Sequence, residues 1–71
     1  MTADEMFEKL GYEKVEENKH FIIYEVGTSQ IRFVLKTKKI RVCDDLDIFK
    51  YMDMEELQAI NKKCEELGWI K

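Results

Sequence analysis

The residue types best suited to holding a metal ion are few and widely separated in this chain. Cys43 and Cys64 are its only cysteines, and His20 is its only histidine. Zinc sites use such ligands in closely spaced pairs, whereas here twenty residues separate the cysteines and no Cys-x-x-Cys pair occurs. We therefore expect two free thiols, no metal site and no other cofactor.

Carboxylates offer the next chemistry to consider. Asp44, Asp45 and Asp47 form an acidic segment, but it lacks the ligand spacing and the glycine of a calcium-binding loop. No motif combines a nucleophile with a base and an orienting group, and the three glycines are isolated from one another. The sequence thus predicts neither a catalytic site nor a phosphate-binding loop, and we expect a protein that is not an enzyme.

Positive charge gathers in one segment, which we call the basic hairpin (residues 32–41). Its cationic residues, with no acidic residue between them, are Arg32, Lys36, Lys38, Lys39 and Arg41. Such a patch could bind phosphates, with the ring of Phe21 as a stacking surface. The whole chain has a net charge of −3, however, and carries no nucleic-acid-binding motif. We expect an acidic protein surface as the partner, with nucleic-acid binding as the alternative.

Two helices bracket the chain. Each begins with a capping box, in which the first side chain accepts from a free backbone N–H and a glutamate three residues later reaches back. The capping pairs are Thr2 with Glu5 and Asp53 with Glu56. A glycine followed by an aromatic residue ends each helix, so we expect helices over about residues 3–10 and 54–67. The apolar stripe Leu57, Ile60, Cys64 and Leu67 should be the buried face of the second helix.

Between the helices, alternating apolar residues predict four strands joined by three tight turns. A turn at Asn18–Lys19 places Val15 opposite Ile22. Turns at Thr28–Ser29 and Thr37–Lys38 place Phe33 opposite Tyr24 on one side and opposite Val42 on the other. One face of the sheet would then collect the apolar residues Val15, Ile22, Tyr24, Val26, Ile31, Phe33, Leu35, Ile40 and Val42. Both helices should cover this inner face, giving a two-layer α+β sandwich of order αββββα with a four-stranded antiparallel meander.

The opposite, outer face of the sheet is where a partner could bind. In the predicted register Phe21, Ile23 and Val34 form a small apolar centre, and Glu25 lies opposite Arg32. Lys14 and Glu16 of the first strand would also lie on this face. The partner-binding residues that we predict are Phe21, Ile23, Val34, Arg32, Lys36 and Arg41. The alternative is a half-exposed sheet face that only stabilises the fold.

Length and composition set the class of protein. Seventy-one residues make one domain, 1–71, near the lower limit of what a single core can support. An apolar content of 45% and a small net charge are those of an ordinary folded protein. No signal peptide is recognisable, and no apolar run approaches the roughly 20 residues that a membrane span requires. We expect a cytoplasmic protein with no membrane partner.

The sequences at both ends of the chain resemble those of one group of known proteins. The opening residues 2–12 and the closing residues 54–69 resemble those of small uncharacterised proteins encoded by phages and prophages of low-GC Gram-positive bacteria. The resemblance implies a cytoplasmic accessory protein that acts by binding, and it carries over no catalytic residue. We therefore expect a small non-catalytic protein-binding module that uses the outer face, either on another protein or to form a homodimer.

Overall fold

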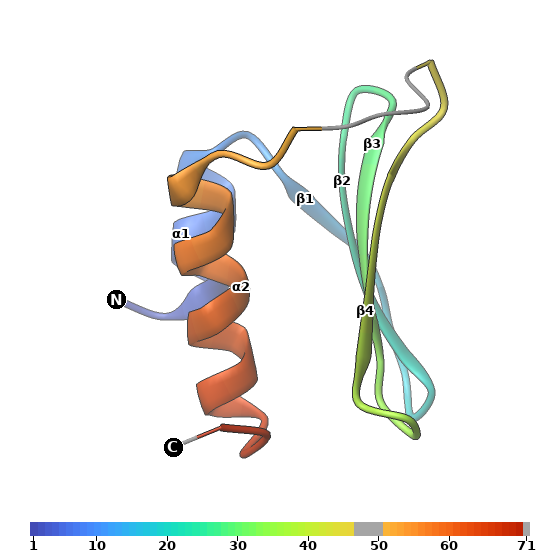
Figure 1. Cartoon of the computed structure of the whole chain (residues 1–71), viewed down its shortest axis with the longest axis vertical. Coiled ribbons are helices and arrows are strands. Elements are labelled where there is room, and N and C mark those ends of the chain that lie inside the picture. Colours follow the sequence, from blue (N-terminus) through green and yellow to red (C-terminus); the bar gives the residue numbers. More distant parts are fainter. Residues whose placement is uncertain (47–50, 71) are drawn as a thin grey trace.

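The structure, a computed structural model, describes residues 1–46 and 51–70. Its elements in chain order are α1 (Ala3–Lys9), β1 (Glu13–Glu17), β2 (Phe21–Val26), β3 (Ser29–Val34), β4 (Lys39–Asp44) and α2 (Met54–Glu66). The strands form one antiparallel sheet in the order β1-β2-β3-β4, and both helices lie on the same side of it (Figure 1). The predicted α+β architecture is confirmed.

Both helices begin and end where the local signals placed them. Thr2 and Asp53 are the N-caps, and each forms a complete capping box with the glutamate three residues later. Gly11 and Gly68 adopt positive φ angles of 91° and 77° just beyond the helix ends. Glycine adopts this left-handed conformation without the steric cost that a Cβ atom brings, and so it stops the helix.

The registers predicted for the second and third hairpins are wrong by two residues each. Tyr24 lies opposite Ile31 rather than Phe33, because the turn is at 27–28, where Gly27 takes a φ of 56°. Phe33 lies opposite Ile40 rather than Val42, because residues 35–38 form the next turn and Lys38 takes a φ of 55°. A slip of two residues keeps each side chain on its face, so the predicted faces of β2, β3 and β4 stand.

The prediction for β1 is wrong in a way that changes faces. Its register with β2 shifts between Lys14 and Glu16, so that Val15 is the extra residue of a bulge and is 44% exposed. Lys14 lies opposite Tyr24 and therefore on the inner face, with the helices, rather than on the outer face. The first turn also lies one residue further along the chain than predicted: the backbone N–H of Asn18 donates to the carbonyl of Phe21, and the side chain of Asn18 accepts from the backbone N–H groups of His20 and Phe21.

The core lies between the helices and the middle of the sheet. Its completely buried aromatic residues are Phe7 of α1, Tyr24 of β2 and Phe33 of β3. Phe7 stacks on Tyr24 with ring centroids 4.1 Å apart and meets Phe33 edge-on at 6.3 Å. Ala3, Ile22, Ile31, Ala59 and Ile60 fill the space around these rings. The two central strands therefore supply most of the buried sheet surface.

The stripe predicted for α2 is only partly buried. Ile60 and Cys64 are in the core, whereas Leu57 is 46% exposed. The helix instead buries Glu56, which accepts from the hydroxyl of Tyr12 at 2.5 Å, and Lys63, whose Nζ lies 3.6 Å from Asp4 Oδ1. These polar contacts turn one side of α2 toward α1 and Tyr12, and so Leu57 stays near the surface.

The connection between β4 and α2 is described only at its two ends. Leu46 is 84% exposed and Tyr51 is 92% exposed. The apolar residues Ile48 and Phe49, which the sequence places in the same connection, lie outside the described residues. Among the helices that the structure describes, none has the length and apolar character needed to cross a bilayer.

Candidate protein-binding face

The outer face of the sheet is built from three rows of residues that run across β2, β3 and β4. In each row the strands pair directly, so the side chains stand next to one another on the same face. The rows are Phe21–Val34–Lys39, Ile23–Arg32–Arg41 and Glu25–Gln30–Cys43. Two of the three β2 residues are apolar, the third is Glu25, and positive charge increases toward β4.

Arg32 is the residue that joins the apolar centre to the charged rim. Its guanidinium carbon lies 5.3 Å from the centroid of the Phe21 ring, a distance at which cation and ring attract each other. Its Nη2 donates to Gln30 Oε1 at 3.2 Å. Its Nε is buried and has no hydrogen-bond partner within the described part of the chain. The side chain therefore lies flat on the sheet, with part of its donor capacity unused.

Glu25 does not pair with Arg32, and this part of the prediction is wrong. Because the hairpin register is shifted by two residues, Glu25 lies opposite Gln30, whose Nε2 donates to Glu25 Oε2 at 2.7 Å. Arg32 faces Ile23 on one side and Arg41 on the other. Gln30, which sequence reasoning did not single out, thus connects the only carboxylate of these rows to the guanidinium. Gln30 could have been identified as part of the site only from the correct strand register.

The structure brings together five of the six predicted site residues. Phe21, Ile23, Arg32 and Val34 are half-buried side by side on the outer face, and Arg41 is exposed beside them. Lys36 is the exception, because it lies in the turn at 35–38 and not on a strand. It extends the basic character to the end of the sheet rather than to its outer face.

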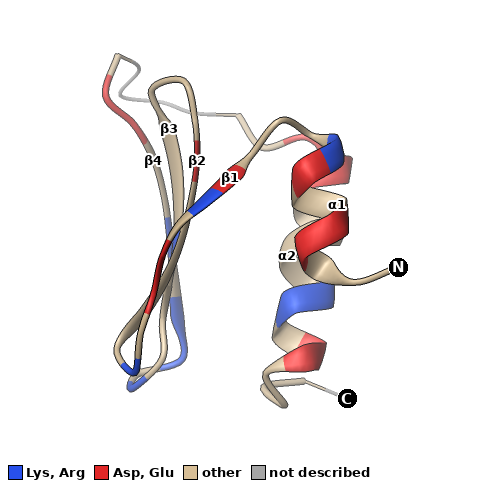
Figure 2. Cartoon of the chain, turned by 180° about the vertical axis from the view of Figure 1, so that it is seen from behind, with Lys and Arg blue, Asp and Glu red and all other residues tan. Residues whose placement is uncertain are grey.

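Charge is distributed unevenly over the molecule. Lysine and arginine gather at the end of the sheet that carries the β1–β2 and β3–β4 turns, whereas α1 and the opposite end of the sheet carry acidic residues (Figure 2). The two turns share one end because the strands form a meander. An acidic chain, with a net charge of −3, therefore presents a local positive surface.

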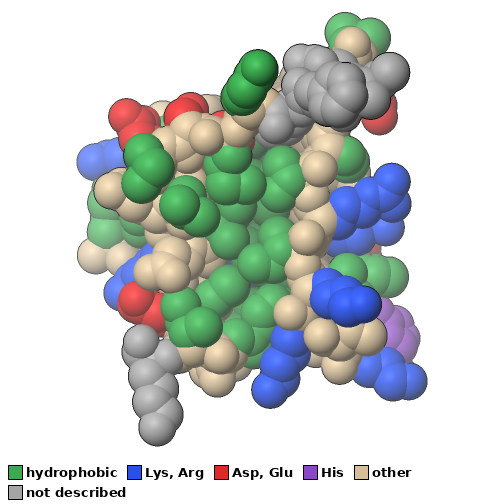
Figure 3. Space-filling model, in the orientation of Figure 1, with side chains coloured by type: hydrophobic (Ala, Val, Ile, Leu, Met, Phe, Trp, Pro, Cys, Tyr) green, Lys and Arg blue, Asp and Glu red, His purple; other side chains and the backbone are tan. Residues whose placement is uncertain are grey.

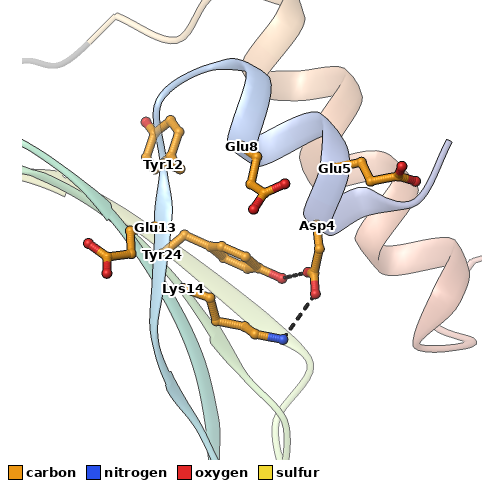
Figure 4. A pocket seen from close by; sticks show the side chains of 7 residues that line it. All are labelled: Asp4, Glu5, Glu8, Tyr12, Glu13, Lys14 and Tyr24. Atoms are coloured by element: carbon orange, nitrogen blue, oxygen red, sulfur yellow. Dashed lines mark hydrogen bonds and ion pairs between the residues drawn. The ribbon is translucent and has the colours of Figure 1, made fainter.

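A second polar site lies on the helix side, where α1 meets β1 and β2. It is a hollow of about 360 Å³ that Asp4, Glu8, Glu13, Lys14 and Tyr24 help to line (Figure 4). The hydroxyl of Tyr24 and the ammonium of Lys14 both point to the carboxylate of Asp4, at 2.5 Å and 3.0 Å (Figure 4). The acidic group at its centre is thus already engaged, and these contacts hold α1 on the sheet.

These contacts shift the proton affinities of the groups that make them. Burial acts to raise the pKa of Asp4, but hydrogen bonds from Tyr24 and Lys14 and the charge of Lys63 outweigh it, so the pKa lies below its usual value. Burial, reinforced by the bond to Asp4, raises the pKa of the Tyr24 hydroxyl. Hydrogen bonds to Glu17 and Asp4 raise the pKa of Lys14. Each group thus keeps its neutral-pH charge state, which favours a structural linkage.

The residues considered for metal binding do not come together. Cys43 is half-buried on the outer face, and Cys64 is buried in the core. Both are free thiols. Across residues 1–46 and 51–70 no group of three or more histidine, cysteine or carboxylate side chains is placed to hold a metal ion.

Comparison with known proteins identified no relative of this chain. No protein-family model matches the chain, and no curated protein or solved structure matches it either.

Proposed function

We propose that the protein is a small, non-catalytic binding module whose outer sheet face docks on an acidic surface of another protein. The observation that carries this proposal is the row Ile23–Arg32–Arg41, in which an apolar residue, a half-buried guanidinium and an exposed guanidinium stand side by side. An apolar centre beside an arginine-rich rim is typical of protein interfaces, where arginine and aromatic residues are enriched.

The guanidinium of Arg32, which is only half-buried, supports a partner that carries carboxylates. A guanidinium donates through a planar fork and binds a carboxylate in a bidentate manner. Arg32 uses Nη2 on Gln30, and its guanidinium carbon lies over the ring of Phe21. A carboxylate that approached from the partner would find Arg41 directly beside Arg32. Two adjacent guanidinium groups repel each other, so an anion between them removes an unfavourable interaction as well as forming new bonds.

The outer face suits a different protein better than a second copy of itself. Two such faces packed together would bring Arg32, Lys39 and Arg41 of each chain near their equivalents, and Glu25 is held by Gln30. Like charges at an interface are unfavourable. The resemblance of the chain ends to phage and prophage proteins supports a cytoplasmic partner from a phage or its host.

The test compares proteins captured from a Gram-positive host lysate by the wild type, by Arg41→Glu and by Lys62→Glu. Arg41 lies on the outer face, whereas Lys62 is an α2 residue whose ammonium lies 3.9 Å from Glu65, a weak ion pair. Arg41 is exposed and Lys62 is partly exposed, so reversing either charge should leave folding nearly intact. We expect a partner that the wild type and Lys62→Glu retain after nuclease treatment and that Arg41→Glu loses. Equal retention by all three proteins would contradict the proposal.

The alternative is nucleic-acid binding through the basic hairpin. The observation that favours it is the gathering of lysine and arginine at one end of the sheet, beside the exposed turn that contains His20 (Figure 2). Each phosphate contact by a cation makes the affinity fall steeply as salt concentration rises. Fluorescence anisotropy with a labelled single-stranded oligonucleotide separates the two functions. Binding that weakens steeply with salt and is lost on replacing Lys36 and Lys38 with serine would support this alternative.

A further inference from the structure

Within residues 1–46 and 51–70, no strand pairs with the outer edge of β4. The strand order ends at β4, and the backbone of Asp45 donates to the carbonyl of Thr28 at 3.1 Å, continuing the β3–β4 ladder. In an antiparallel pair only every second residue exchanges hydrogen bonds with the neighbouring strand. Counting back from Asp45, Cys43 and Arg41 bond to β3, so the N–H and C=O groups of Ile40 and Val42 point away from the sheet.

An apolar band lies next to this edge. In the view that faces β4, apolar side chains fill the space between α2 and β4 without a helix or strand over them (Figure 3). Ile40 on the inner face of β4 is 37% exposed, and Val42 beside it is only partly buried against the core. On α2, Leu57 is 46% exposed, on a different side of the helix from Glu56, which faces Tyr12, and from Lys63, which faces Asp4 of α1. Open edges flanked by apolar surface are sites of strand addition.

We propose that a second copy of this chain covers the edge, with the two β4 strands antiparallel about a two-fold axis that passes through Val42. Val42 then pairs with Val42 of the second copy, and Arg41 stands opposite Cys43. The outward backbone groups of Val42 bond across the axis in both directions. Because the register keeps inner faces together, both pairs of helices lie on one side, and the two apolar bands meet at Val42, with Ile40 opposite Asp44 of the second copy. The sheet becomes continuous through both chains.

Charge along β4 selects this arrangement. The strand begins with Lys39 and Arg41, and acidic Asp45 follows its last residue, so an antiparallel copy brings opposite charges together. In the proposed register Lys39 stands opposite Asp45 of the second copy. Moving the axis to Arg41 would instead oppose two arginines, and a shift of one residue would send the helices to opposite sides of the sheet.

This dimer is independent of the proposed function but has a consequence for it. The outer faces of both copies lie on the same side of the continuous sheet, so the dimer presents two binding faces in a fixed relation. A partner with two acidic sites would be bound more tightly by such a dimer than by one chain. The dimer also uses a different surface from the outer-face homodimer that the sequence suggested.

Sedimentation of the full chain tests the proposal. We expect the wild type to dimerise below about 100 μM, a modest affinity for a small interface. Val42→Pro removes an N–H that points away from β3, so it spares the existing ladder and should raise the dimer dissociation constant about tenfold or more. Ile23→Lys, on the outer face, should leave the constant unchanged. A monomeric wild type, or a dimer lost with Ile23→Lys and kept with Val42→Pro, would overturn the proposal.

Cross-linking tests the register without a change in the backbone. In a Cys64→Ala background, Arg41→Cys places new thiols opposite Cys43 of the second copy, at a non-hydrogen-bonded pair whose spacing suits a disulfide. We expect oxidation to link this variant on a non-reducing gel. Neither the background protein nor Lys39→Cys should link, because their thiols are not opposed. Linking of Lys39→Cys, or of the background protein through Cys43 alone, would contradict the register, and no linking in any variant would contradict the dimer.

Discussion

The hydroxyl of Tyr24, at the centre of the sheet, donates a 2.5 Å hydrogen bond to Asp4 in the first turn of α1. Lys14 of β1 and Lys63 of α2 reach the same carboxylate, with Nζ–Oδ distances of 3.0 Å and 3.6 Å. One acidic side chain therefore connects both helices and two strands. These contacts hold the layers together from the inner side of the sheet, away from the outer face.

Acid should weaken the protein partly through Asp4. Its pKa in the folded state is below the ordinary value of 3.8, so its contribution to stability is present above pH 3.8 and is lost as the pH falls through the lower folded-state pKa. We expect Asp4→Asn to lower the free energy of unfolding at pH 7, because Lys14 and Lys63 lose their shared anion. Urea denaturation at pH 7 and near pH 3 measures this. If the difference in free energy of unfolding between the wild type and Asp4→Asn grew toward low pH, the stabilising role of the Asp4 carboxylate would be contradicted.

Alkali should destabilise the fold through the two buried tyrosines. Burial, together with the bond to Asp4, raises the pKa of Tyr24, and burial with the bond to Glu56 raises that of Tyr12. Because the folded-state pKa values are raised, the stability they contribute is complete below pH 10.0 and declines as the pH rises toward them. Ultraviolet absorbance should show both rings ionising only as the protein unfolds. Ionisation of both in the folded state would exclude the two hydrogen bonds.

Phe33 and Phe21 should differ sharply in their contribution to stability. Phe33 is fully buried among Phe7, Tyr24 and Trp69, whereas Phe21 is half-buried on the outer face. Phe33→Ala should lower the free energy of unfolding by about 3–5 kcal/mol, as is typical for a core phenylalanine. Phe21→Ala should cost markedly less. Similar losses for the two variants in chemical denaturation would mean that the faces are assigned incorrectly.

Gly27 tests the corrected turn between β2 and β3. Its φ of 56° is unfavourable for a residue with a Cβ atom, although no neighbouring atom within 4 Å would obstruct that atom. Gly27→Ala should therefore destabilise the protein by about 1 kcal/mol through backbone conformation alone. Gly27→Asn should cost less, because asparagine tolerates this region better. Thermal denaturation measures the stability of both variants. If Gly27→Ala were as stable as the wild type, Gly27 would not have the positive φ angle that this turn requires.

The helices and the faces of the inner strands could be predicted because their signals are local. Capping boxes such as Thr2–Glu5 and a following glycine specify helix ends within a few residues. Hairpin registers could not be predicted to the residue. Alternation has a period of two, so opposing Phe33 with Val42 or with Ile40 satisfies the same pattern. The turn decided between them, and Lys38 with a positive φ gave no clear signal in the sequence.

The bulge at Val15 and the polar contacts of the core lay beyond sequence reasoning for different reasons. A bulge reverses the alternation along the strand, and nothing in the residues Lys14, Val15 and Glu16 announces the reversal. The burial of Glu56 and Lys63 depends on Tyr12 and Asp4, which are distant in the chain. At the candidate site, alternation along the strand predicted that Ile23 lies on the outer face. It did not predict which residues of the neighbouring strand lie opposite Ile23.

The central claim, that the outer sheet face is the partner-binding surface, is tested most directly by amide NMR of the labelled protein during titration with its captured partner. The account predicts that chemical-shift changes concentrate on Ile23, Arg32, Val34 and Arg41. The exposed residues Asn61 and Glu65 of α2 should stay unchanged. Shifts that concentrate on α2, or on the hollow around Asp4, and leave the outer face unaffected would contradict the claim.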